Sequence, residues 1–195
     1  MTGRVTHLLY LHGFRSSPQS TKARAMAAWV QAHRPELTWH CPQLPPSPRE
    51  ALAQVQGVTA GWPLAGMAVI GSSLGGFYAT ALAEATGCRA VLLNPAVDPA
   101  RDLARHTGET SAWHSDEPFH FRAEFVTELR AMTPAALTRP ERYFAVIAKG
   151  DEVLDWREMT TRYGGCSQRL LEASDHALSD FAEHLPEVTR FLGLS

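Results

Sequence analysis

One short stretch, Met67 to Leu82, limits the folds open to this chain more than any other feature. It reads MAVIGSSLGGFYATAL: an apolar run too short for a helix, then a glycine-rich turn, then good helix formers. The turn matches the pattern G-x-S-x-G, with Ser73 between Gly71 and Gly75. A serine on so tight a turn has a strained backbone, and flanking glycines leave room for it. The pattern predicts either a nucleophile elbow with a raised serine hydroxyl or a plain glycine-rich turn.

The composition predicts one globular domain that acts on a small molecule. The chain has 195 residues, 45% of them hydrophobic and 19% charged, enough for a substantial core. The net charge is −2 and Lys and Arg form no long block, which argues against nucleic acid or an anionic membrane as a partner. No stretch has the roughly 18 apolar residues of a membrane span, and the N-terminal apolar run is too short for a signal peptide.

Cysteine usage points to the same class of protein. Cys41, Cys88 and Cys166 are odd in number, widely spaced and without a C-x-x-C pair. Such spacing favours neither a disulfide framework nor a zinc site. The expected compartment is therefore the cytoplasm.

Apolar, strand-like runs alternate with helix-like segments along most of the chain. The runs lie at residues 7–11, 37–41, 67–70, 89–93, 143–148 and 168–172, with helices between them and a closing helix at 179–192, broken or restarted at Pro186. This alternation predicts an α/β fold, in which residues 1–195 form one compact, mainly parallel sheet with helices on both faces. Residues 98–140 interrupt it with a long polar and aromatic segment, a lid-like insertion.

Four of the expected strands end in groups that acyl transfer would use. They are His12-Gly13-Phe14, then Ser73, Asp151 and His176. The carboxyl ends of parallel strands meet at one edge of a sheet, so these groups are expected to lie together. The chain order Ser, Asp, His is that of an α/β hydrolase. This agreement favours the nucleophile elbow over the plain turn.

Each of these residues has a role in the expected chemistry. Ser73 attacks an acyl carbonyl, and His176 takes the serine proton and later gives it to the leaving group. Asp151 holds the imidazole in the right tautomer and stabilises the imidazolium. The backbone amides of Leu74 and Phe14 form the oxyanion hole, where losing one donor typically costs about 100- to 1000-fold in rate.

Neighbouring residues offer alternatives to these assignments. Ser72 lies beside the expected nucleophile, but only Ser73 occupies the centre of the G-x-S-x-G pattern. Asp155 is a rival to Asp151 as the acid. It is expected instead to cap a helix that begins at Trp156, because the acid should sit in the first loop residues after its strand.

The histidines and one further aspartate also have competing explanations. His12 is expected to fix the oxyanion loop by hydrogen bonding. Asp175 is expected to stabilise its loop or to lie at the rim of the site, rather than to act as a second acid. Three other histidines, His106, His114 and His120, raise the alternative of a metal site. Their spacing matches no compact ligand motif, so no metal is expected.

The insertion at residues 98–140 lies in sequence between the expected nucleophile and the expected acid, so it should cover the site. Trp113 and Phe119, with Phe121 and Phe125, would give it an apolar underside that contacts an acyl chain. The alternative is that these aromatic residues anchor the insertion to the body of the protein. Both roles are compatible with the sequence.

The chain resembles the YqiA-like esterases, a family of small bacterial α/β hydrolases, over nearly its whole length. The motifs that carry the resemblance are YLHGF with SSP at 10–18, PQLPP at 42–46, GSSLGG at 71–76, NPAV at 94–97, GDEVLD at 150–155, DHA at 175–177 and FLGL at 191–194. The resemblance implies carboxylesterase activity on simple acyl esters, with acyl-CoA thioesters as an extension, and no metal or organic cofactor. It carries Ser73, Asp151 and His176 over as the triad. The departures are residues 113–116 and Leu178.

Three functions follow from this sequence. The leading expectation is a serine esterase or thioesterase that acts on a small-molecule acyl ester. The same triad could instead cleave amides or peptides. A hydrolase-like binding module without turnover is a third reading, which the presence of all three residues and the elbow glycines disfavours.

Overall fold

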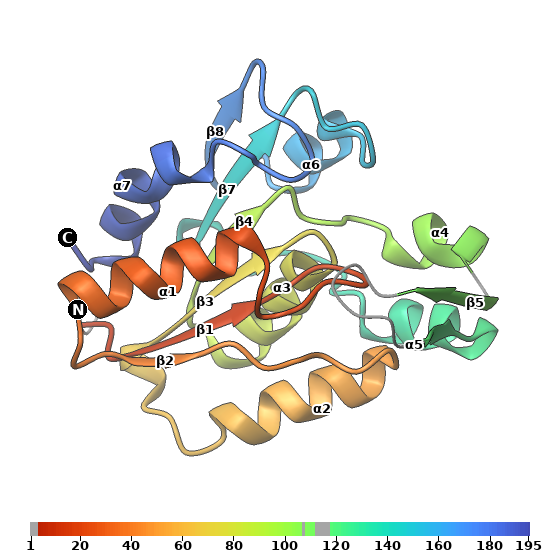
Figure 1. Cartoon of the computed structure of the whole chain (residues 1–195), viewed down its shortest axis with the longest axis horizontal. Helices are drawn as coiled ribbons and strands as arrows, with labels where there is room; N and C mark the ends of the chain where they lie inside the picture. Colours follow the sequence, from red (N-terminus) through yellow and green to blue (C-terminus); the bar gives the residue numbers. More distant parts are fainter. Residues whose placement is uncertain (1–3, 107, 112–117) are drawn as a thin grey trace.

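A six-stranded parallel sheet forms the centre of the protein (Figure 1). The computed structural model describes residues 4–106, 108–111 and 118–195, and for residues 108–111, 118 and 119 the backbone alone. Across the sheet the strands are β2 (Thr38–His40), β1 (His7–Leu11), β3 (Met67–Ser72), β4 (Arg89–Leu93), β7 (Tyr143–Ala148) and β8 (Ser167–Leu171). Every neighbouring pair is parallel. The expected α/β fold with a parallel sheet is confirmed.

The register of the strands brings their carboxyl ends to one edge. Leu11 pairs with Gly71, and Ser72 with Leu93. Leu93 in turn pairs with Val146, two residues before the end of β7. The loops that follow β1, β3, β4 and β7 therefore start beside one another.

Helices cover both faces of the sheet, and each face has its own core. Alternate residues along β1 point to opposite faces: Leu8 and Tyr10 join the core under α1 (Thr21–His33) and α7 (Phe181–Leu192). Leu9 and Leu11 join the core under α2 (Pro48–Thr59), α3 (Leu74–Thr86) and α6 (Trp156–Arg162). This is the period of two that a strand imposes on its side chains. Both faces of the sheet are thus buried, as parallel sheets require.

The insertion at residues 98–140 is built of short elements. They are α4 (Pro99–Leu103), the 3-10 turn Ala104–His106, the antiparallel strands β5 (Gly108–Ser111) and β6 (Pro118–Phe121), and α5 (Ala123–Met132). α5 packs against α2 and α4, and it buries Phe125 and Leu129 in the core. Glu128 of α5 accepts hydrogen bonds from the Ser47 hydroxyl at 2.8 Å and from the Arg49 amide at 3.0 Å. The insertion is therefore joined to the body by apolar and polar contacts.

The expected break at Pro186 is wrong, because α7 runs without interruption from Phe181 to Leu192. Proline lacks an amide hydrogen and normally costs a helix one internal hydrogen bond. The helix tolerates this loss because Phe181, Val188 and Leu192 are buried against the sheet. Packing of an apolar face stabilises a helix more than the propensity of one residue weakens it.

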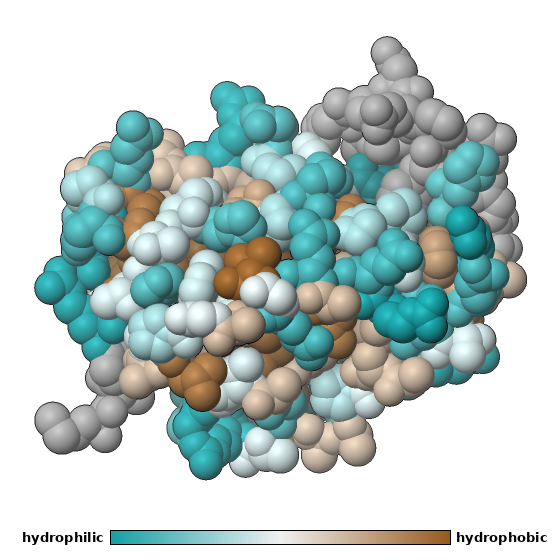
Figure 2. All heavy atoms as spheres, turned by 90° about the horizontal axis from the view of Figure 1, so that it is seen from below, coloured by the Kyte–Doolittle hydropathy of each residue, from teal (hydrophilic) through white to brown (hydrophobic). Residues whose placement is uncertain are grey.

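The face of the molecule that Figure 2 shows is mostly polar. Figure 2 shows the face on the side of α2 as hydrophilic and neutral residues with separate apolar spots. Among the residues whose side chains are described, the exposed large apolar ones are Leu64, Val153 and Leu170. Within the described ranges, no helix has the length and apolar character needed to cross a bilayer.

Candidate active site

Ser73 lies on a strained turn between β3 and α3. Its backbone has φ 54° and ψ −119°, a conformation that residues other than glycine rarely adopt. Hydrogen bonds hold the turn on both sides. The Ser73 amide donates to the Leu93 carbonyl at 2.9 Å, and the Ser73 carbonyl accepts from the amides of Gly76 and Ala96 at 2.9 and 3.0 Å. Hydrogen bonds to the end of β4 and to the loop after it thus fix the position of the serine backbone.

The two glycines of the pattern are required by close backbone approach. A Cβ atom on Gly71 would lie 2.2 Å from the Gly75 carbonyl oxygen, and one on Gly75 would lie 2.0 Å from the Leu11 carbonyl oxygen. Neither distance is compatible with a side chain. The absence of both side chains lets α3 start directly against the end of β1. It follows that the elbow and the loop after β1 are in contact.

Asp151 and His176 are joined by a hydrogen bond at the ends of β7 and β8. His176 Nδ1 lies 2.7 Å from Asp151 Oδ2, and the aspartate side chain is fully buried. The other carboxylate oxygen, Oδ1, accepts hydrogen bonds from the amides of Val153 and Leu154, both at 2.8 Å. The carboxylate is therefore fixed in position, and the Nδ1–H···O bond leaves His176 Nε2 free to accept a proton.

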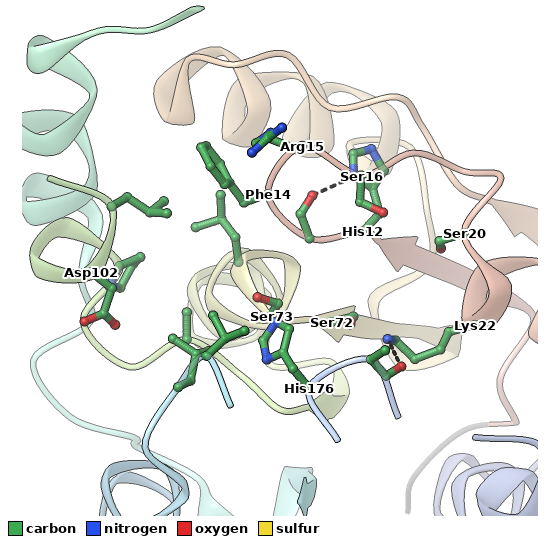
Figure 3. A pocket seen from close by; sticks show the side chains of 18 of the residues that line it. His12, Phe14, Arg15, Ser16, Ser20, Lys22, Ser72, Ser73, Asp102 and His176 are labelled. Carbon is green, nitrogen blue, oxygen red and sulfur yellow. Dashed lines mark hydrogen bonds between the residues drawn. The ribbon is translucent and has the colours of Figure 1, made fainter. Parts of the chain in front are cut away.

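Figure 3 shows the His176 ring beside the Ser73 hydroxyl, and both residues line one cavity. In the described part of the chain, Ser73 and His176 are adjacent but share no hydrogen bond. Catalytic hydrogen bonds are often long in unliganded enzymes and shorten when substrate binds. The strand-end residues expected from the sequence are thus brought to one place.

The loop that carries His176 is held by Asn94 and Glu152. The Asn94 amide donates to the carbonyls of Asp175 and His176 at 3.0 and 3.1 Å, and its oxygen accepts from the Ala148 amide at 2.8 Å. Glu152 accepts from the His176 amide at 3.1 Å. Asn94 is completely buried and has φ 42°. These contacts position the histidine relative to β4 and β7.

Sequence reasoning gave neither Asn94 nor Glu152 a role in the site. Two signals for Asn94 were available. It is the only asparagine in the chain, and it directly follows a buried strand. Asparagine is among the few residues that adopt a left-handed backbone readily.

His12 has a structural role in the loop after β1. Its Nε2 accepts a hydrogen bond from the Leu44 amide at 3.1 Å, and its Nδ1 lies 3.0 Å from the Gly13 carbonyl, to which it donates. Burial lowers the pKa of the ring, while the bond to Gly13 acts in the opposite direction. A neutral ring with both nitrogens occupied cannot serve as a base, in keeping with the expectation that His12 fixes this loop.

The rival acids also have structural partners. Asp155 is the N-cap of α6 and accepts from the Arg157 amide at 2.9 Å. Asp175 accepts from the amide and hydroxyl of Ser179 at 2.9 and 2.7 Å. These bonds lower the pKa of Asp175, although burial slightly opposes them. Asp155 caps the helix at Trp156 as the sequence indicated, and among the described residues neither aspartate side chain is hydrogen-bonded to His176.

The two residues expected to supply the oxyanion amides, Leu74 and Phe14, line the same cavity as Ser73. Leu74 is the first residue of α3, so its amide has no acceptor within the helix. Phe14 lies in the loop after β1, and both residues line the cavity with Ser73. The Phe14 ring packs edge-on against Phe121 of the insertion, with ring centroids 5.3 Å apart. The loop after β1 is thereby connected to β6.

The cavity has a volume of about 650 Å³ and runs from the insertion, past Ser73, to the start of α1 (Figure 3). The residues of the insertion that line it are Pro99, Asp102, Leu103, Arg105 and His106. None of them was expected from the sequence to contact substrate. The pair Asp98-Pro99, an N-cap followed by proline at the first helical position, indicates that a helix starts here. It does not indicate that this helix contacts the cavity.

The aromatic residues expected to contact substrate are only partly described. Trp113 and the side chain of Phe119 lie outside the described residues. Phe121 and Phe125 are buried, with 1% and 6% of their surface exposed, and their rings pack at 5.5 Å. Phe121 and Phe125 therefore anchor the insertion, as the alternative interpretation holds. His106 packs against the Phe14 ring at 5.8 Å.

Comparison with solved structures agrees with this architecture. Mouse alpha/beta hydrolase domain-containing protein 10 matches with a TM-score of 0.72 and 14% identity, covering 98% of this chain and 92% of the other. A structure from work on LipS and LipT, two metagenome-derived lipolytic enzymes, matches with a TM-score of 0.74 and 18% identity, covering 100% and 96%. Est1E from Butyrivibrio proteoclasticus with bound ferulic acid matches with a TM-score of 0.70 and 13% identity, covering 98% and 89%. At these identities the likeness establishes the fold alone.

A family model covers nearly the whole sequence. It matches residues 7–193 and describes an uncharacterised protein family, UPF0227. The resemblance to the YqiA-like group is thereby confirmed. The chain belongs to the UPF0227 family, with the α/β-hydrolase fold.

Proposed function

We propose that this protein is a serine hydrolase that cleaves acyl esters, with Ser73 as nucleophile, His176 as base and Asp151 as orienting acid. One observation supports this most strongly. The His176 ring is tied to a buried carboxylate at 2.7 Å and lies beside a serine with a strained, left-handed backbone, on one cavity. Strain of this kind persists only where the surroundings impose it, and it is concentrated at functional sites.

The proposed reaction has two steps. The Ser73 hydroxyl adds to the acyl carbonyl carbon while its proton passes to His176 Nε2, and the amides of Leu74 and Phe14 stabilise the oxyanion. Collapse of this intermediate breaks the bond to the alcohol, which leaves with the proton from His176. Water then adds to the acyl-enzyme by the same route, and the free acid and the serine hydroxyl are regenerated.

Esters are the proposed substrates because the cavity and the neighbours both favour them. The cavity contains apolar side chains such as Leu74, Ala96 and Leu103 next to the serine, which suits the acyl chain of a small molecule. Among the structural neighbours are a protein with bound ferulic acid and lipolytic enzymes. Acyl-CoA thioesters are a second proposed substrate class, since the same acyl transfer applies to them.

A series of p-nitrophenyl esters of increasing acyl length tests the proposal, measured beside an acyl-CoA and an anilide. Wild type should hydrolyse the esters, and Ser73→Ala should lose at least about 1000-fold in rate. A fluorophosphonate probe should add to Ser73, as located by mass spectrometry. Equal rates for wild type and Ser73→Ala would refute the proposed serine-hydrolase activity. Faster turnover of the anilide than of the esters would favour amide hydrolysis.

The insertion is the proposed source of chain-length preference. Residues Trp113 and Phe119 are proposed to contact the acyl chain from residues 98–140. Replacing both with alanine should change the ratio of octanoate to acetate hydrolysis more than it changes the rate with acetate, because acetate is too short to reach them. Equal losses with both esters would instead assign these residues to anchoring.

A further inference from the structure

The cavity extends beyond Ser73 to the first turn of α1, where its wall becomes polar. Ser20, Lys22 and Ser72 lie on this side of the Ser73 hydroxyl, whereas Phe14 and Asp102 lie on the other side (Figure 3). Tyr10 of β1 lines the same cavity, and its phenol lies near the hydroxyls of Ser20 and Ser72. A substrate centred on Ser73 therefore meets hydroxyl groups and Lys22 on one side, and on the other a mixed wall of apolar residues such as Phe14 and Leu103 with the charged residues Arg15, Asp102 and Arg105.

The first turn of α1 departs from the usual chemistry of a helix start. Ser20 occupies the N-cap, but its side chain makes no capping hydrogen bond, and the first turn contains no acidic residue. The second position of the helix is Lys22. A positive charge beside the positive end of a helix dipole is unfavourable. The missing cap and the unfavourable charge occur together at the wall of a cavity, and such local departures from helix preferences are expected at functional sites.

Lys22 is a partly buried cation with spare hydrogen-bonding capacity. Its ammonium donates to the carbonyl of Ala177, the residue after His176. In the described part of the chain it forms no ion pair within 4 Å. Burial lowers the pKa of Lys22 to about 8, whereas the carboxylates of Asp175 and Asp151 act to raise it. Even partial burial makes a charge without a direct counter-ion unfavourable, so an anion that enters the cavity would stabilise it.

Two hydroxyl groups, those of Tyr10 and Ser20, line the same cavity as Lys22. The Tyr10 phenol and the Ser20 hydroxyl are both buried and form no hydrogen bond with the described residues. Burial raises the pKa of Tyr10, which stays a neutral O–H donor, and the hydroxyls of Ser72 and Ser20 lie close to it. Both hydroxyls are therefore available to a ligand that accepts hydrogen bonds.

We propose that the polar end of the cavity, formed by Lys22, Ser20 and Tyr10, binds a carboxylate carried by the substrate. A carboxylate accepts several hydrogen bonds and supplies the negative charge that Lys22 and the start of α1 lack. This inference rests on the proposed esterase function and specifies its substrate class. The substrates are esters with a free acid group on the acyl or the alcohol part.

The test compares charged esters with neutral esters of the same shape. One pair places the charge on the acyl part: mono-p-nitrophenyl adipate against p-nitrophenyl 6-methylheptanoate. The other places it on the alcohol part: 4-acetoxybenzoate against 4-isopropylphenyl acetate. In at least one pair, wild type should have the higher kcat/KM for the charged ester. Lys22→Met should lower the charged-to-neutral ratio at least tenfold, and Lys22→Arg should retain most of it.

Arg24→Met is the matched control, because it removes a positive charge from the exposed side of the same helix, outside the cavity. It should leave the ratio within about twofold, as an exposed charge is well screened. If Lys22→Met slows charged and neutral esters equally in both pairs, Lys22 only braces the His176 loop and the proposal is overturned. A ratio that changes as much in Arg24→Met would also overturn it, in favour of a general field effect.

A binding measurement separates this proposal from the proposed function. Adipate is titrated calorimetrically into Ser73→Ala and into Ser73→Ala with Lys22→Met, with adipamide as the neutral control. Adipate should bind the first protein at least tenfold more tightly than the second, and adipamide should bind both alike. This result would support the carboxylate site even if ester turnover failed. Equal adipate binding by the two proteins would refute the site even if turnover were intact.

Discussion

Single side chains account for most of what is specific about this site, and the two aspartates after β7 show how. Asp151 and Asp155 are four residues apart in one loop, yet their hydrogen bonds differ. Asp151 is buried against His176, and Asp155 is a helix N-cap. Burial and the identity of the partner, more than the residue type, separate an aspartate that is bonded to a histidine ring from one that caps a helix.

Replacing each aspartate with asparagine tests this division. Asp151→Asn should lower kcat by about 1000- to 10,000-fold, because an amide at this place favours the wrong tautomer of the ring. Asp155→Asn should alter kcat less than about threefold, since asparagine caps helices as well as aspartate does. Steady-state kinetics with p-nitrophenyl acetate gives both values. The opposite ranking would assign the acid to Asp155.

Asn94 is proposed as a positioning residue for His176. It binds the carbonyls of the histidine loop from a strand two places away from β8 in the sheet. Asn94→Gly keeps the left-handed backbone and removes only the side chain. It should cost about 1–3 kcal/mol of unfolding free energy because the Ala148 amide and two carbonyls lose their partner.

The kinetic effect of Asn94→Gly separates positioning from stability. Displacement of the ring should lower kcat about 10- to 100-fold with little change in KM. Asn94→Ala has the same loss of bonds and adds the strain of φ 42°. It should be less stable than Asn94→Gly with a similar kcat. If kcat of Asn94→Gly equals that of wild type while stability falls, the residue has a purely structural role.

Among the elements, the junction of β3 and α3 depends on the end of β1. The start of α3 touches the Leu11 and His12 carbonyls so closely that Gly75 has no room for a methyl group, whereas a Cβ atom added to Gly57 in α2 would meet no atom within 4 Å. Substitution of these two helical glycines by alanine should therefore change the stability in opposite directions. One is required by packing and the other only weakens its helix.

Gly75→Ala and Gly57→Ala form a matched pair for this contact. Gly75→Ala should lose about 3 kcal/mol or more of unfolding free energy, because α3 must move away from β1. Gly57→Ala should gain about 0.5–1 kcal/mol, since alanine is the better helix former and meets no neighbour. Urea denaturation followed by circular dichroism measures both. A Gly75→Ala protein as stable as wild type would contradict the close approach.

The sequence predicted the elements that depend on local patterns and missed the contacts that depend on tertiary structure. The elbow, the sheet and the strand-end residues follow from short motifs and from the rule that parallel strands end at one edge. The roles of Asn94 and Lys22 depend on which distant loop comes to lie beside them, which no local pattern encodes. Pro186 was misjudged because the apolar face of α7 outweighs one missing hydrogen bond.

Stability of the complete fold depends on carboxylates that connect distant segments. Glu84 of α3 accepts hydrogen bonds from the Thr138 hydroxyl at 2.7 Å and the Tyr143 hydroxyl at 2.5 Å. It thus joins the end of the insertion to α3 and β7. Burial alone would raise the pKa of Glu84, but the bonds from Tyr143 and Thr138 lower it overall. Deprotonated Glu84 is the form that the folded protein prefers.

The acid dependence of unfolding should report this preference. A carboxyl group whose pKa is depressed in the folded protein stabilises it above the unfolded pKa of about 4.3, and this stabilisation is lost as the pH falls through the folded pKa. Wild type should therefore lose unfolding free energy between about pH 5 and pH 3. Glu84→Gln should be less stable than wild type at pH 7, and the difference should shrink as the pH falls, because protonated Glu84 has also lost its charge.

Glu172→Gln is the control, because the exposed ion pair of Glu172 with Lys149 should contribute little to stability. Urea unfolding of the three proteins at several pH values decides the matter, and a wild type to Glu84→Gln difference that does not depend on pH would contradict the assignment.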